Sequence, residues 1–102
     1  MVLILSRRDL EAVMTMKETI EAVENAFKEL TLGKARMPTR VGLTVFDRAG
    51  WMGVMPAYLS EIGSLAAKVV AVFEDNPSKY NLPTVLATVT LNDASTGYPL
   101  AF

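Results

Sequence analysis

Apolar side chains recur every three or four residues in the first third of the chain, which is the spacing of an amphipathic helix. Four residues form this stripe: Ile20, Val23, Phe27 and Leu30. Thr15, with Glu18 three positions later, has the pattern of a capping box at a helix N-terminus. Gly33 suits the left-handed position that follows a helix. The pattern therefore predicts a helix over residues 16–32.

Upstream, Val2 to Leu5 is a short apolar run that we expect to be a strand. Ser6 then has the character of an N-cap, with Asp9 at the third helical position. A short helix is expected over RRDLEAVM, residues 7–14.

The remainder of the chain consists of apolar runs, one of them alternating with small or polar residues, which indicates strands. We expect five of them, over residues 41–45, 51–56, 65–73, 84–91 and 98–102. Pro56 is expected to end the second strand, because proline cannot donate a hydrogen bond to a ladder. Two helices followed by strands predict an α+β fold, with the N-terminal helices packed on one face of a mostly antiparallel sheet.

The composition of the chain excludes several classes of function. The chain has 102 residues, enough for one domain, and it contains neither cysteine nor histidine. Thiolate chemistry, a Ser-His-Asp site and cysteine- or histidine-based metal sites are excluded, and a cytoplasmic protein is expected. Ten basic residues oppose eleven acidic ones, so no basic field is available for nucleic acid or a membrane surface. No apolar run reaches the roughly 20 residues of a membrane-spanning helix.

Two cations are the first candidates for chemistry. Lys68 is the only charge in the run LAAKVVAVF. Its ammonium could bind a carboxylate in a pocket, or it could reach water from the end of a strand. Arg40 directly precedes the expected strand 41–45. Its planar guanidinium group could bind a carboxylate there or lie free on the surface.

Two further residues are candidates for a binding site. Met55 could give a pliable apolar wall to a ligand, although a strand methionine can also simply pack in a core. Thr84 follows Pro83 at the start of an apolar strand, after the polar stretch EDNPSKYN. It could be an ordinary strand residue or part of a rigid rim that faces a ligand.

The chain stops at Phe102, within an expected strand. Two explanations are open at this point. The sequence could be a fragment of a longer protein, or the domain could end with an edge strand.

Five segments together resemble the ornithine cyclodeaminase/μ-crystallin family, in the family's order and over essentially the whole chain. They are LILSRRDLEAVMTMKETIEAVENAFKELTLGKARMPTRV, VMPAYL, AAKVVAVFEDNP, NLPTV and TGYPLA. The family includes ornithine and lysine cyclodeaminases, archaeal-type alanine dehydrogenases and ketimine or pyrroline-carboxylate reductases. These enzymes use NAD(H) or NADP(H) to interconvert an amino acid and its imine.

The resemblance implies roles for four residues. Arg40 in MPTRV matches the family arginine that binds the substrate carboxylate, and Lys68 in AAKVV matches the lysine beside that carboxylate and the reacting imine. Lys68 is thereby implied to be catalytic as well as substrate-binding. Met55 in VMPAY and Thr84 in NLPTV match other positions of the substrate pocket. Lys68 is expected to lie near Thr84 across the connecting loop.

The resemblance also implies what the 102 residues leave out. The family's Rossmann domain, with its glycines, and the catalytic aspartate would follow Phe102, so no cofactor-binding or metal-binding residue is expected here. Residues 1–102 are thus expected to be a single substrate-binding and dimerising domain, the N-terminal part of a longer, homodimeric or higher oligomeric protein. The alternatives are a μ-crystallin-like module that binds a small ligand without catalysis, or a purely structural fragment.

Overall fold

The computed structural model describes residues 1–102 and begins with two helices, α1 (Arg7–Val13) and α2 (Met16–Thr31). Both start where their caps predict. The Ser6 hydroxyl accepts a hydrogen bond from the Asp9 N–H (3.2 Å), and the Asp9 carboxylate accepts one from the Ser6 N–H (2.8 Å). That Ser6 N–H holds the pKa of Asp9 below its ordinary value, because it stabilises the ionised carboxylate. Both expected helices are confirmed.

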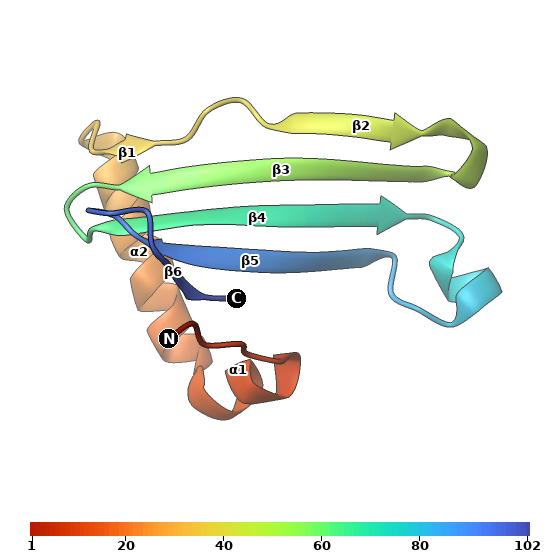
Figure 1. The fold of residues 1–102 in the computed structure, drawn as a ribbon, viewed down its shortest axis with the longest axis horizontal. Coiled ribbons are helices and arrows are strands. Elements are labelled where there is room, and N and C mark those ends of the chain that lie inside the picture. The colour runs from red at the N-terminus through yellow and green to blue at the C-terminus, as the bar shows by residue number, and fades with distance from the viewer.

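A single sheet of six strands follows the helices (Figure 1). The strands are β1 (Ala35–Arg36), β2 (Val41–Val45), β3 (Gly50–Leu59), β4 (Ser64–Phe73), β5 (Val85–Asp93) and β6 (Pro99–Ala101). They are ordered β1-β3-β4-β5-β6, and β2 pairs with the same edge of β3 as β1 does. Every pair of named strands is antiparallel, which confirms the α+β fold.

The start of the chain joins the other edge of the sheet. The Leu3 N–H donates to the Leu100 carbonyl (2.9 Å), and the Phe102 N–H donates to the Leu3 carbonyl (2.8 Å). This contact runs parallel to β6. The apolar start therefore pairs with the last strand, but only as an isolated bridge rather than a full strand.

The expectation that Pro56 ends its strand is wrong, because β3 continues to Leu59. The reason lies in the register. The Phe73 N–H donates to the Thr84 carbonyl, so the backbone polar groups of Phe73 point toward β5. Those directions alternate along a strand, and Ala67 is an even number of residues from Phe73, so the backbone N–H and carbonyl of Ala67 also point toward β5. Pro56 is paired with Ala67, so its nitrogen points away from β4, into the gap between β2 and β1. No ladder hydrogen bond is lost there.

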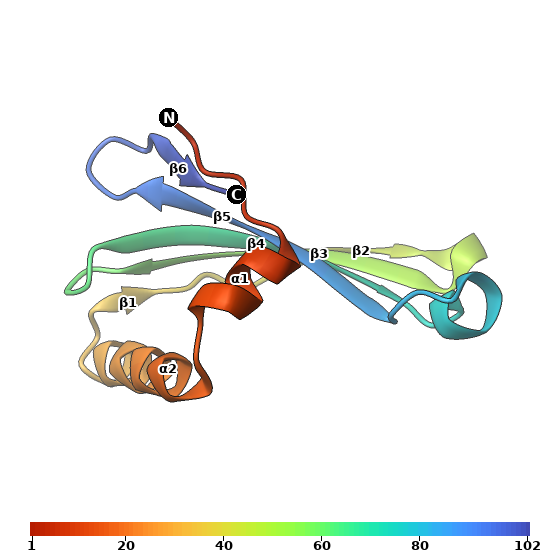
Figure 2. The same ribbon diagram turned by 90° about the horizontal axis from the view of Figure 1, so that it is seen from below.

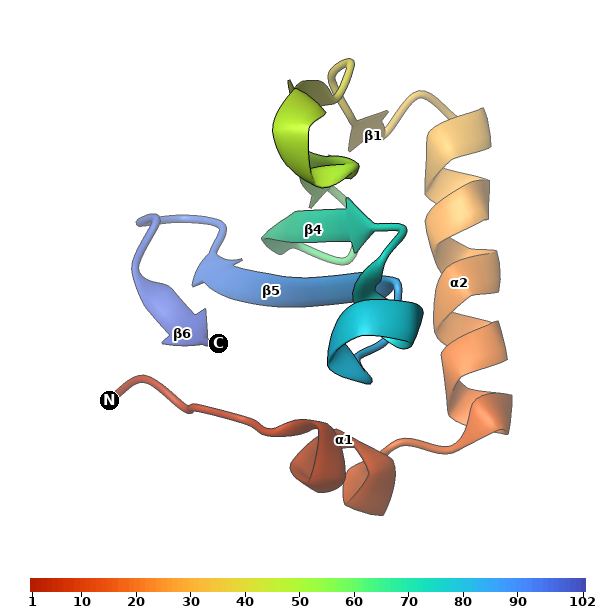
Figure 3. The ribbon, with the colours of Figure 1, turned by 90° about the vertical axis from the view of Figure 1, so that its right-hand side faces the viewer.

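Helix α2 lies across the strand ends on one side of the sheet and contacts it near β1 and β3 (Figures 2 and 3). Its apolar stripe is not covered by this contact, since Phe27 is 63% exposed and Ile20 57% exposed. The anchor is polar instead. Glu29, only 5% exposed, accepts hydrogen bonds from the N–H groups of Glu61 (2.7 Å) and Ile62 (3.3 Å) in the β3–β4 turn.

The same turn is tied to the segment after α2. The Ser60 N–H and hydroxyl both donate to the Lys34 carbonyl (3.0 and 2.8 Å), and the Lys34 ammonium pairs with the Glu61 carboxylate. Its hydrogen bond and its charge hold the pKa of Glu61 below the ordinary value. This cluster is the main link between helix and sheet.

The chain has almost no core of its own. Val70 is the only buried hydrophobic residue, and four residues in all are buried. The accessible surface is 8058 Å², whereas a compact protein of this mass exposes about 5,700 Å². The radius of gyration is 15.7 Å, against about 13 Å for a compact chain of 100 residues. Roughly 2,400 Å² of surface is therefore in excess of what a compact protein of this mass exposes.

None of the helices is long and apolar enough to cross a membrane.

Replacing Glu29 with alanine should lower the free energy of unfolding by about 1–3 kcal/mol, because two N–H groups of the β3–β4 turn would lose their acceptor. Urea denaturation of the two proteins measures the difference. Glu24→Ala is the matched control on the same helix, since Glu24 is exposed and makes only a long ion pair with Lys28 (3.7 Å). Equal effects of the two substitutions would contradict the anchoring role of Glu29.

Candidate functional site

Two of the four predicted site residues are direct neighbours across the central strands. Met55 of β3 is paired with Lys68 of β4, and Lys68 is paired with Val89 of β5. Directly paired residues of an antiparallel sheet point to the same face. We call this surface the Lys68 face.

Arg40 continues the same row. It directly precedes β2, whose first residue Val41 is paired with Val54, so Arg40 occupies the position that extends this register opposite Met55. Two strand spacings separate it from Lys68, or about 10 Å between the backbones. Two long cationic side chains can reach a common anion across that distance.

Both cations are available to a ligand. Lys68 and Arg40 are exposed, and neither takes part in an ion pair within the chain. Lys68 is the only charged side chain on its face of β3 and β4. An ammonium and a guanidinium above an apolar floor have the donor geometry that recognises a carboxylate.

Thr84 is not part of this row. Its carbonyl accepts the Phe73 N–H (2.9 Å), five positions along β4 from Lys68, which corresponds to about 16 Å. The expectation that Lys68 lies near Thr84 across the loop is therefore wrong within this chain. The segment that precedes Thr84 is held in place by a hydrogen bond, because the Asn76 side-chain amide donates to the Pro83 carbonyl (3.0 Å).

The structure adds Trp51, which the sequence pattern alone did not single out. Trp51 lies on the Lys68 face, and its indole covers Gly42 and Gly53, which are paired with each other. A Cβ on Gly42 would lie 2.6 Å from the ring atom Cζ2, and one on Gly53 would overlap the ring as well. The signal was present as two glycines within expected strands, which often mark a close approach.

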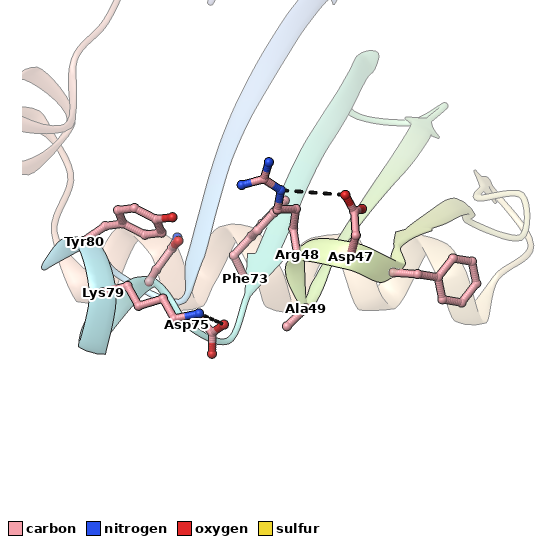
Figure 4. Close-up of a pocket in the computed structure, with 9 residues that line it drawn as sticks. Asp47, Arg48, Ala49, Phe73, Asp75, Lys79 and Tyr80 are labelled. Carbon is pink, nitrogen blue, oxygen red and sulfur yellow. Dashed lines mark hydrogen bonds and ion pairs between the residues drawn. The ribbon is translucent and has the colours of Figure 1, made fainter.

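A cavity of about 680 Å³ lies elsewhere, at the end of the strands farthest from α2 (Figure 1). It is formed between the turn Phe46–Arg48 and the helical turn Asn76–Tyr80 (Figure 4). Its charges neutralise each other locally: Arg48 lies 3.8 Å from Asp47, and Lys79 lies 3.0 Å from Asp75. The hydrogen bond to Asp75 and its charge raise the pKa of Lys79. Since none of the four predicted residues lines this cavity, we place the candidate site at the Lys68 row.

The donors present do not fit a metal or a dinucleotide. No group of three or more acidic, histidine or cysteine side chains is placed to hold a metal ion. The named strands pair only antiparallel, and both α-helices precede the sheet. The β–α–β unit that presents a helix N-terminus to a pyrophosphate is therefore not part of these residues.

The comparisons with known proteins agree with one another. The model of the ornithine cyclodeaminase/mu-crystallin family matches residues 2–102. Alanine dehydrogenase of Archaeoglobus fulgidus is 43% identical over 97% of this chain and 29% of its own length. The chain thus spans about 30% of the proteins it resembles.

Solved structures show the same fold. Δ1-pyrroline-2-carboxylate reductase of Thermococcus litoralis, in complex with NADH and L-proline, is 49% identical with a TM-score of 0.93, over 97% of this chain and 30% of that one. An archaeal alanine dehydrogenase dimer with bound NAD is 42% identical with a TM-score of 0.89, over 98% of this chain and 30% of that one.

Proposed function

The chain belongs to the ornithine cyclodeaminase/mu-crystallin family, and from that premise we propose that it is the substrate-binding and dimerising domain of an NAD(P)-dependent amino-acid dehydrogenase, imine reductase or cyclodeaminase. Residues 1–102 would be the N-terminal part of that longer protein, because its relatives are about three times as long. The nicotinamide cofactor would bind to residues outside this part. The observation that carries the proposal is the row of Arg40, Met55 and Lys68, with two cations lacking partners.

The row supports recognition of an α-amino or α-imino acid. Arg40 would bind the carboxylate with its fork, and Lys68 would approach the same carboxylate from the other side of Met55. Charge-assisted hydrogen bonds of this kind are shorter and about twice as strong as neutral ones.

Lys68 would have a second role. Its ammonium can donate a proton toward the substrate nitrogen, which lies one carbon from the carboxylate. Met55 would form the apolar floor between the two cations. Thr84 is about 16 Å along the strands from this row, too far to contact the same small amino acid as Lys68, so its role in the pocket stays a prediction.

Replacing Lys68 with methionine in the full-length protein should reduce kcat/KM for imine reduction by about 100-fold or more, because a charge-assisted contact and the group that donates a proton to the substrate nitrogen are both lost. Steady-state kinetics measure the change. Lys17→Met is the control, since Lys17 is an exposed lysine of α2. Retention of most of the activity in the Lys68 variant would rule out the proposed site.

The other face of the sheet supports dimerisation. On β2 to β5 this face carries no charged side chain, and we call it the charge-free face. It includes exposed residues such as Leu43 (59% exposed) and Val41 (72% exposed). An apolar surface of this extent marks an interface, and the excess of roughly 2,400 Å² is the scale of stable subunit interfaces. We propose that a second copy packs on this face.

Replacing Leu43 with lysine should shift the protein from dimer to monomer, because the new charge would be buried without a partner. Light scattering coupled to size-exclusion chromatography measures the mass. Phe46→Lys is the control, since Phe46 is 91% exposed and lies in the turn after β2. An unchanged mass for Leu43→Lys, or an equal change for both variants, would contradict this choice of face.

A second function fits the same row. A module that binds a small carboxylate without redox chemistry would need the cations of Arg40 and Lys68 but no dinucleotide fingerprint, and none is present in these residues. Whether the gene encodes a glycine-rich nucleotide-binding domain after Phe102 distinguishes the two. Its presence favours the enzyme, and a stop codon there favours the module.

A further inference from the structure

We propose that Trp51 forms the wall against which the substrate side chain packs, and that it makes the site selective for compact, uncharged aliphatic side chains. This inference rests on the proposed carboxylate site at Arg40 and Lys68. It adds a residue that determines specificity and names the class of side chain that the site accepts.

The position of the indole is fixed by the backbone around it. Trp51 starts on β3 opposite Val72, and its ring lies over the Gly42–Gly53 pair. That pair is the row directly next to Arg40, Met55 and Lys68 on the same face, about 7 Å along the strands. A side chain at either glycine position would collide with the ring, so the two glycines leave the space that the indole occupies.

The floor beside the ring is apolar and closed. Val70 is paired with Gly53 and, at 7% exposed, is the only buried hydrophobic residue of the chain. Ala87 is the next residue of this row, on β5. A ligand whose carboxylate lies between Arg40 and Lys68 would therefore direct groups toward the indole across the apolar row of Gly53, Val70 and Ala87.

The charges on this face select against a cationic side chain. Arg40 and Lys68 already place two positive charges around the site. The only acid on this face of the strands is Asp93, four residues along β5 from Val89, or about 13 Å. One oxygen of its carboxylate, Oδ1, also accepts hydrogen bonds from the N–H groups of Ser95 (2.8 Å) and Thr96 (2.9 Å). Glu74, which follows β4, lines a pocket together with Trp51, but it is six residues along the chain from Lys68, or about 20 Å. A side-chain ammonium close to Arg40 and Lys68 would therefore have two repelling neighbours.

The test uses the full-length protein and a series of amino acids that differ only in the side chain: glycine, alanine, 2-aminobutyrate and ornithine. In the wild type, kcat/KM for oxidation should rise from glycine to 2-aminobutyrate, and ornithine should be the poorer substrate. Trp51→Ala should lower the ratio of kcat/KM for 2-aminobutyrate over glycine by about 10-fold or more, which is the range for apolar contacts in a pocket. Trp51→Phe should retain most of the ratio.

Two glycine variants separate the wall from general stability. Gly53→Ala should lower the same ratio, because its Cβ would displace the indole. Gly50→Ala is the matched control: it lies on the same strand, and its Cβ would displace the Phe73 ring on the charge-free face, so the ratio should not change.

The outcomes distinguish this inference from the proposed function. An unchanged ratio in Trp51→Ala, an equal loss with glycine and 2-aminobutyrate, or a wild-type preference for ornithine would overturn the role of Trp51. Arg40→Ala tests the carboxylate site separately, and it should reduce kcat/KM for every member of the series. Full activity of Arg40→Ala with all substrates would instead refute the proposed function on which the inference rests.

Discussion

The burial of the charge-free face of the sheet is the interaction on which the rest of this structure depends. Strands β3, β4 and β5 are nine or ten residues long and form a continuous ladder, so their hydrogen bonds are largely satisfied within the chain. The apolar side chains of these strands remain largely exposed, because the chain buries only one hydrophobic residue. Hydrogen bonds alone contribute little net stability, whereas apolar burial is the dominant favourable term. The charge-free face must therefore be covered by another polypeptide surface.

The two faces differ in the kind of partner they suit. The charge-free face offers only apolar and neutral side chains, which fits permanent contact with a protein surface. The Lys68 face carries two cations with no partner in the chain, and a permanent apolar contact there would bury them at a cost of several kcal/mol. An anionic ligand that enters and leaves removes this conflict. The proposed division of one sheet into an assembly face and a ligand face thus rests on where Lys68 lies in the alternation of β4.

Features that depend on neighbouring residues in the sequence were predicted well, whereas features that depend on pairing between distant segments were predicted poorly. The helix starts at Ser6 and Thr15 were correct because capping involves residues three positions apart. The continuation of β3 through Pro56 depends on a gap between two other strands, which no local pattern reveals. The position of the Trp51 indole depends on the pairing of Gly42 with Gly53. The separation of Thr84 from Lys68 depends on the β4–β5 register. The residue pattern singled out Arg40, Met55 and Lys68 as candidates, and the resemblance to a family implied their roles. The register then placed them in one row.

The dependence of stability on protein concentration tests the central claim most directly. If the sheet is stable only when its charge-free face is covered by a second copy, unfolding of this chain is coupled to dissociation. Raising the concentration 1,000-fold should then increase the apparent free energy of unfolding by about 4 kcal/mol, and the denaturation midpoint should rise with it. A midpoint that does not change over this range, together with the mass of a folded monomer, would contradict the account.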